Sequence, residues 1–155
     1  AYFYISWTIA SMLFIIPSSV ARNFLTEGSY SLNGVSFKKA LLFSLGLVIL
    51  SIIFVFIFGK FILNIFNAEY ISGLSLLYIL ALSSIPYSFN QIYITLLNLK
   101  KKVGKVMLLY FFISFLAIIF SLIFVNKGLN YIGYSWFFAN FLGLIFIGVF
   151  YRKWR

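Results

Sequence analysis

Long apolar runs separated by short polar segments dominate the pattern along this chain. Five mostly apolar stretches occupy about 1–20, 40–58, 71–97, 106–125 and 129–150. A helix needs about 20 apolar residues to cross a hydrocarbon core of about 30 Å, and each stretch is close to that length. Strands of a membrane barrel are shorter and alternate in polarity, which these runs do not. The pattern therefore predicts an all-α, polytopic transmembrane helix bundle with five spans.

Composition supports a lipid environment and excludes several kinds of function. Of the 155 residues, 64% are hydrophobic and 9% are charged, whereas soluble domains have about 25% charged residues. The chain has no Cys and no His, which excludes disulfides, Ser-His-Asp triads and Cys/His metal sites. The only carboxylates, Glu27 and Glu69, are expected on opposite sides of the membrane. We therefore expect no catalytic residue, no metal site and no cofactor, and a protein that is not an enzyme.

Basic residues collect in alternate connections between the apolar stretches. They follow the first, third and fifth stretches, at Arg22, Lys38, Lys39, Lys100, Lys101, Lys102, Lys105, Arg152, Lys153 and Arg155. The other two connections hold only Lys60 and Lys127. Because short loops rich in Lys and Arg stay in the cytoplasm, the C-terminus is predicted to be cytoplasmic. The net charge of +10 then points to membrane lipids as partners, and we expect no nucleic acid.

The third stretch carries the most polar residues. Five of them fall at i, i+3, i+4, i+7 and i+11, on one helix face: Ser84, Tyr87, Ser88, Gln91 and Thr95. Pro86 removes a backbone donor and frees the carbonyl of Leu82. One interpretation is a cavity-lining helix with a flexible point, as in transporters that alternate between two faces. The other is a packed bundle with interhelical hydrogen bonds worth about 1 kcal/mol each.

The first stretch repeats the combination of proline and hydroxyl groups. Pro17 is followed by two serines at 18–19, so Pro17 and Pro86 are both candidate hinges. Arg22 directly closes this stretch, where its side chain would either extend to the interface or point into a cavity. We therefore count Arg22 among the candidate cavity residues.

Small residues in the fifth stretch predict a close helix contact. They lie at i, i+4 and i+8, at Ser135, Ala139 and Gly143. Asn140, next to that row, is expected to be either a cavity group or an interhelical donor. Trp7, Trp136 and Tyr110 lie near predicted span ends, where amphipathic rings prefer the membrane interface.

Two segments resemble a known family of exporters. The Ile-Ile-Pro-Ser-Ser run at 15–19 and the Asn-Phe-Leu-Thr-Glu-Gly-Ser run at 23–29 resemble the eighth span and following loop of polysaccharide flippases. These belong to the multidrug/oligosaccharidyl-lipid/polysaccharide exporter superfamily. The Phe-Gly-Lys run at 58–60, Tyr70 and the Ile-Pro step at 85–86 are similar to an external loop and a broken span of that family. The similarity extends over essentially the whole chain.

The resemblance implies both an architecture and a function. Residues 1–155 would be a partial C-terminal transmembrane lobe, spans eight to twelve, of a larger two-lobed exporter of six plus six helices. That exporter would flip polyprenyl-diphosphate-linked oligosaccharide across the cytoplasmic (plasma) membrane by alternating access, for surface polysaccharide biosynthesis. Its partners would be this substrate, membrane lipids and the N-terminal half of the same transporter. Cationic cavity residues of the family imply a headgroup role for Arg22 or for that other half.

Two other functions are alternatives to the flippase. A cation-coupled drug exporter of the same superfamily is disfavoured because no carboxylate lies within a predicted span. A membrane-embedded glycan polymerase or transferase would need a sizeable external loop with Arg, Asp or Glu. The predicted external connections, 59–70 and 126–128, are too short for one.

Overall fold

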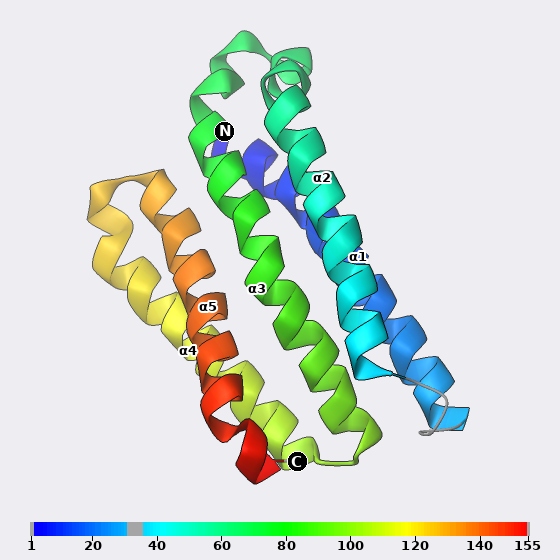
Figure 1. The fold of residues 1–155 in the computed structure, drawn as a ribbon. Coiled ribbons are helices and arrows are strands. Elements are labelled where there is room, and N and C mark those ends of the chain that lie inside the picture. The colour runs from blue at the N-terminus through cyan, green and yellow to red at the C-terminus, as the bar shows by residue number, and fades with distance from the viewer. Residues whose placement is uncertain (1, 31–35, 155) are drawn as a thin grey trace.

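The part of the chain that the structure describes forms five long helices (Figure 1). The computed structural model describes residues 2–30 and 36–154. The helices are α1 (Tyr2–Tyr30), α2 (Phe37–Phe66), α3 (Leu74–Leu99), α4 (Val103–Phe124) and α5 (Leu129–Trp154), with short 3-10 segments at Ala68–Gly73 and Val125–Lys127. All five helices are long and apolar enough to cross a membrane. The predicted all-α bundle with five candidate spans is therefore confirmed.

Two helices continue well beyond the apolar stretches that predicted them. α1 runs through Arg22 and Glu27 to Tyr30, and α2 runs past Lys60 to Phe66. Hydropathy marks the part of a helix that suits lipid, whereas a helix end needs its own stop signal. For α2 that signal is Asn67, whose side chain accepts a hydrogen bond from the Glu69 amide at 3.1 Å and opens the next 3-10 segment.

α3 is the central helix and packs against all four others. Figure 1 shows α2, α3 and α5 nearest the viewer, with α1 and α4 behind them. α2 and α4 expose large apolar side chains along much of their length, such as Phe54, Met107 and Phe111. Such surfaces suit contact with lipid, which has no polar groups to offer at that depth.

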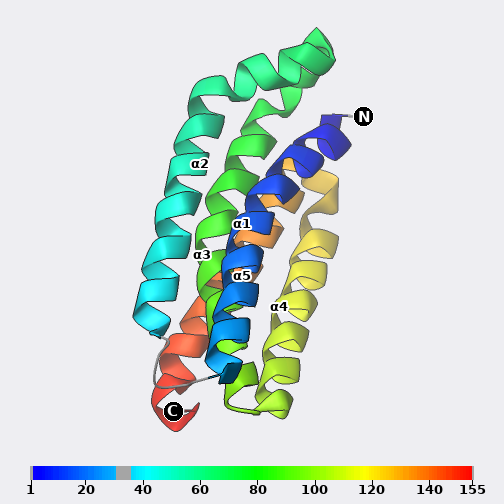
Figure 2. The same ribbon diagram turned by 90° about the vertical axis from the view of Figure 1, so that its right-hand side faces the viewer.

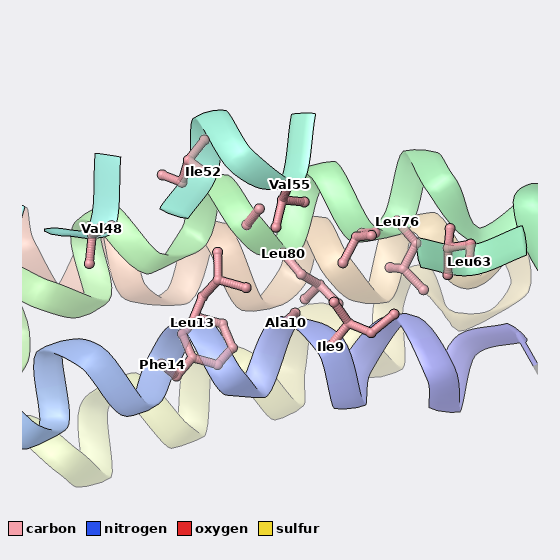
Figure 3. Close-up of a cluster of buried hydrophobic side chains, with 12 residues drawn as sticks. Ile9, Ala10, Leu13, Phe14, Val48, Ile52, Val55, Leu63, Leu76 and Leu80 are labelled. Carbon is pink, nitrogen blue, oxygen red and sulfur yellow. The ribbon is translucent and has the colours of Figure 1, made fainter. Parts of the chain in front are cut away.

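Two apolar clusters hold the bundle together, and α3 contributes to both. Side chains of α1, α2 and α3 point toward one another in the first cluster (Figure 3), which includes Leu13, Phe14, Val48, Val55 and Leu80. The second cluster joins α3, α4 and α5 through Tyr93, Leu97, Leu109, Ile113 and Ala139. In a membrane such clusters act through close van der Waals packing.

Glycines bring α1 and α3 together at both ends of their contact. A Cβ atom at Gly28 would lie 2.6 Å from Leu99 Cδ1, so a larger residue there would displace the Leu99 side chain of α3. At the other end, the Ser6 hydroxyl donates a hydrogen bond to the Gly73 carbonyl at 3.1 Å. A Cβ atom at Gly73 would lie 2.5 Å from that same Ser6 oxygen. The α1–α3 pair is thus closely joined at both ends.

The two prolines lie inside uninterrupted helices. α1 continues through Pro17 and α3 through Pro86, and both rings are buried. Serine hydroxyls next to the prolines bond to main-chain carbonyls of the preceding turn, Ser18 to Phe14 at 2.8 Å and Ser84 to Ala81. These are not the carbonyls that the prolines free, which belong to Leu13 and Leu82. Both helices continue through the prolines, and a hinge role for either proline stays a prediction.

A clear bend occurs in α2, which contains no proline. Figure 2 shows the outer end of α2 turning over the top of the bundle. The hydroxyl of Tyr78 on α3 donates to the main-chain carbonyl of Phe56 at 3.2 Å, and the two rings stack at 4.3 Å. A side chain that competes for a helix carbonyl is a known cause of bending. This contact therefore accounts for the direction of the last turns of α2.

The basic residues of the connections gather at one end of the bundle. The end of α1, the start of α2, the turn between α3 and α4 and the C-terminus all lie at that end (Figure 1). It carries Lys38, Lys39 and Lys100, while Lys60 and Lys127 lie toward the opposite end. The connections rich in basic residues and those poor in them thus lie at opposite ends of the bundle, as the charge pattern predicts.

The small residues of α5 do form a close helix contact, as predicted. Ser135 and Ala139 are fully buried. A Cβ atom at Gly143 would lie 2.8 Å from Ile113 of α4 and 3.1 Å from Asn90 of α3. Any side chain at Gly143 must therefore push α5 away from both neighbours.

We predict that Gly143→Leu lowers the thermal stability of the purified protein in detergent. Forcing a side chain into a filled interface costs about 1–3 kcal/mol. The matched control is Gly148→Leu on the same helix, where a Cβ atom would meet nothing within 4 Å. Thermal unfolding followed by circular dichroism should show a lower midpoint for the first variant and little change for the second. Equal midpoints would contradict the close α3–α4–α5 contact.

Candidate functional site

Three of the predicted cavity residues on α3 are used in packing. Ser84 and Ser88 are fully buried, and Thr95 is nearly so. Ser84 bonds within its own helix, whereas the Ser88 hydroxyl lies 2.6 Å from the Ser44 hydroxyl of α2. Thr95 donates to the Gln91 carbonyl at 2.9 Å. In this structure these hydroxyls therefore stabilise the bundle and do not face an open space.

Asn140 forms an interhelical pair with a residue that the sequence analysis did not select. The Asn90 side-chain amide of α3 donates to the Asn140 carbonyl at 2.9 Å and lies 3.3 Å from its Oδ1. Asn140 in turn donates to the Trp136 carbonyl at 3.0 Å. Asn90 does not lie on the polar stripe predicted for α3. Helical periodicity defines that stripe, and it does not show that Asn90 has a hydrogen-bonding partner on α5. Asn140 is thus an interhelical acceptor, while its own amide donates within α5.

The open polar surface lies on another side of the bundle. Figures 1 and 2 together place α1 and α4 on the same face, with α3 between them in Figure 1. Two pockets open on this face and define what we call the α1–α4 groove. One, of about 220 Å³, is lined by Ser11, Phe14, Ile15, Ser18, Ser19, Arg22 and Tyr87. The other, of about 240 Å³, is lined by Phe3, Trp7, Ala117, Ser121, Ile132 and Trp136.

Aromatic rings form the base between the two pockets. The Trp7 and Trp136 rings meet edge-on at 5.5 Å, and Phe14 lies 6.2 Å from Trp136 and 5.0 Å from Tyr87. Trp7 and Trp136 pack against each other, and their expected position at the membrane interface stays a prediction. Their large rings fill the space between α1 and α5. The groove therefore has a rigid aromatic base.

One α3 candidate, Tyr87, contributes a polar group to this groove. Its hydroxyl lies 3.3 Å from the Ser18 hydroxyl of α1. Gln91 is half-buried next to Tyr110 of α4, which is 45% exposed, and it lines neither pocket. Tyr110 was expected only as an interfacial ring. The signal that would have found it is its helical spacing with the small residues of α4, because Tyr110, Ser114, Ala117 and Ser121 share one face.

Arg22 lies at the edge of the groove, and its side chain is exposed. Among the described residues, no side chain pairs with its guanidinium. It lies about 12 Å before the end of α1, counting 1.5 Å per helical residue. The structure places Arg22 in the lining of this pocket, and both interpretations of its role stay predictions.

The exposed face of α1 differs from those of α2 and α4. Near Arg22 it presents Ser19, Asn23 and Thr26, whereas α2 and α4 present mostly Leu, Ile and Phe. Arg22 follows the predicted apolar stretch at 1–20 and lies toward the basic end of the bundle, away from mid-membrane, where an arginine is unfavourable by about 2.5–3.5 kcal/mol. This face of α1 suits water, a polar ligand or protein better than hydrocarbon. The sequence contained the signal, because Ser11, Ser18, Ser19 and Arg22 fall at i, i+7, i+8 and i+11.

Comparisons with family models, with curated proteins and with solved structures return no match for this chain. The resemblance to polysaccharide flippases therefore stays a prediction. The structure itself locates one polar groove, the α1–α4 groove, in a bundle of apolar helices.

We predict that a cysteine at Ser19 reacts with a water-soluble thiol reagent in membranes. The chain has no natural cysteine, so each single-cysteine variant reports one position. Ile118→Cys is the control, because Ile118 is 60% exposed on the apolar face of α4. The thiol of the Ile118→Cys variant should react at least about tenfold more slowly than that of the Ser19→Cys variant, since a thiolate does not form in hydrocarbon. Equal rates for the two variants would contradict a hydrated groove.

Proposed function

We propose that this chain forms part of a transporter in the cytoplasmic (plasma) membrane. The transporter flips polyprenyl-diphosphate-linked oligosaccharide across the membrane by alternating access, for surface polysaccharide biosynthesis. The observation that carries the proposal is the α1–α4 groove, in which an unpaired Arg22 stands among serine and tyrosine hydroxyls. The sequence resemblance supports the same conclusion.

The groove offers chemistry that suits each polar part of such a substrate. Sugar hydroxyls both donate and accept hydrogen bonds, as do the hydroxyls of Ser18, Ser19 and Tyr87. A guanidinium binds phosphate oxygens through two parallel N–H bonds, so Arg22 is the group for the diphosphate. Rings such as Trp7 and Trp136 provide apolar faces for the carbon side of a sugar. The polyprenyl tail stays in the surrounding lipid.

The proposal also includes a partner for this surface. A groove open along one side cannot by itself close around a substrate. We propose that the N-terminal half of the same transporter covers the α1–α4 groove, and that relative movement of the two halves exposes it to each side in turn. The two carboxylates lie toward opposite ends of the bundle, away from the groove, so neither is placed to couple transport to a cation within it.

We predict that Arg22→Gln reduces polysaccharide export in cells that depend on this protein. Losing a charge-assisted hydrogen bond costs about 1.5–3 kcal/mol, which corresponds to headgroup binding weaker by about tenfold or more. Arg22→Lys should retain part of the activity because it keeps the positive charge. Surface polysaccharide is measured relative to the amount of protein in the membrane.

The matched control is Lys38→Gln, which removes a positive charge at the same end of the bundle but outside the groove. Its export should equal that of the wild type. Normal export by Arg22→Gln, or an equal loss in both variants, would contradict a specific role for Arg22.

We also predict the orientation of the bundle from its charge distribution. A cysteine at Ser72 should be labelled by an impermeant reagent added to intact cells. A cysteine at Gly104 should be labelled only after permeabilisation, because it lies at the basic end. Both positions are at helix ends, Ser72 in the Ala68–Gly73 segment and Gly104 in the first turn of α4. The reverse labelling pattern would overturn the cytoplasmic placement of the C-terminus.

A further inference from the structure

A second polar pocket lies between α1 and α2, away from the groove. It has a volume of about 300 Å³ and is lined by Val20, Asn23, Phe24, Glu27, Ser36, Lys39, Ala40 and Phe43. Glu27 is one of only two carboxylates in the chain, and Lys39 is its only basic neighbour in this lining. The pocket thus offers one negative and one positive group, contributed by two different helices.

These two charges do not neutralise each other directly. Among the described residues, neither Glu27 nor Lys39 is part of an ion pair, although both line the same space. A carboxylate and an ammonium separated by an open pocket fit a ligand that carries the complementary pair of charges. Such a ligand has a cationic group for Glu27 and an anionic group for Lys39.

The same two helices form an apolar groove farther along. Its volume is about 710 Å³, and it is lined by Ile9, Met12, Leu13, Ile16, Leu50, Ser51, Ile53, Phe54, Val55, Ile57, Phe58, Ile62 and Phe66. Ser51 is its only hydroxyl, and that hydroxyl donates to the Leu47 carbonyl at 2.8 Å. The lining therefore offers no free polar side chain to a ligand.

Helical spacing places the pocket and the apolar groove on one continuous seam. On α1, the groove residues Ile9 and Ile16 and the pocket residues Asn23 and Glu27 fall at i, i+7, i+14 and i+18, which is a single face. On α2, Lys39 and Phe43 share a face with Leu50 and Phe54, at i, i+4, i+11 and i+15. Phe43 and Leu50 are separated by about 10 Å along α2. An acyl chain can span that distance.

We propose that this seam binds an aminophospholipid of the phosphatidylethanolamine class. Glu27 accepts hydrogen bonds from the headgroup ammonium, and Lys39 binds the phosphate. The acyl chains follow the α1–α2 seam into the apolar groove. The charges of the pocket match this headgroup, and continuity with the groove selects a lipid over a soluble zwitterion. The inference does not rest on the transport proposal, because the seam uses a face of α1 different from that of Arg22.

The test is a lipid titration of the purified full chain in detergent, followed by native mass spectrometry. Phosphatidylethanolamine, phosphatidylglycerol and phosphatidylcholine with identical acyl chains are compared. We expect the first to bind about tenfold more tightly than the other two. Phosphatidylglycerol lacks the ammonium, and the quaternary ammonium of phosphatidylcholine has no N–H to donate. Equal binding of all three lipids would overturn the proposal.

Charge variants identify the residues involved. Glu27→Gln should remove the preference for phosphatidylethanolamine over phosphatidylglycerol, whereas Glu69→Gln, which changes the other carboxylate, should keep it. Lys39→Gln should weaken the binding of both lipids, and Lys38→Gln should not. The exchange Glu27→Lys with Lys39→Glu should restore the preference and so separates charge recognition from misfolding. Loss of the preference in Glu69→Gln, or no loss in Glu27→Gln, would refute the assignment.

A competition experiment distinguishes binding of a whole lipid from binding of its headgroup alone. Glycerophosphoethanolamine carries the same charges without acyl chains and should compete at least tenfold more weakly than the lipid. Equal competition would show that the apolar groove contributes nothing, and the lipid assignment would then be wrong.

Discussion

The absence of hydrogen-bonding solvent in the hydrocarbon core is the constraint on which this structure depends. Each buried hydroxyl and amide must find a partner inside the protein. Ser88 with Ser44, and the Asn90 amide nitrogen with Asn140, meet that requirement across helix interfaces, whereas Asn90 Oδ1 and Trp136 Nε1 are buried without a partner. The same requirement gives meaning to the exceptions, because a polar group left open in a membrane helix calls for a ligand, water or another protein surface. Arg22 on α1 is the clearest such group.

Most of the architecture could be predicted from the sequence. Apolar runs of bilayer length identified all five helices, and the row Ser135, Ala139 and Gly143 identified a close contact of α5. Helix ends and bends could not be predicted in the same way. The end of α1 lies beyond its apolar stretch, and the bend of α2 depends on Tyr78, a residue of the next helix. Such features arise from tertiary contacts that hydropathy does not record.

The candidate site could be predicted only in part, for a related reason. Periodicity correctly placed polar residues of α3 along one stripe, but it could not show which neighbouring helix covers each of them. Ser84, Ser88 and Thr95 are covered, whereas Tyr87 lines the α1–α4 groove. The stripe on α1 has fewer polar residues than that on α3, yet its polar side chains Ser19 and Arg22 are exposed. Exposure, and not polarity alone, separates a candidate site from a packing interface.

The glycine contacts of α1 with α3 limit how this bundle can change shape. Gly28 meets Leu99 at one end of the pair, and Gly73 meets Ser6 at the other. Sliding of α1 along α3 would break the Ser6–Gly73 hydrogen bond and displace the Leu99 side chain at Gly28. These contacts favour movement of α1 and α3 as a pair, in which the groove residues Arg22 and Tyr87 keep their relative positions. A change of shape would then involve the contacts of this pair with α2, α4 and α5.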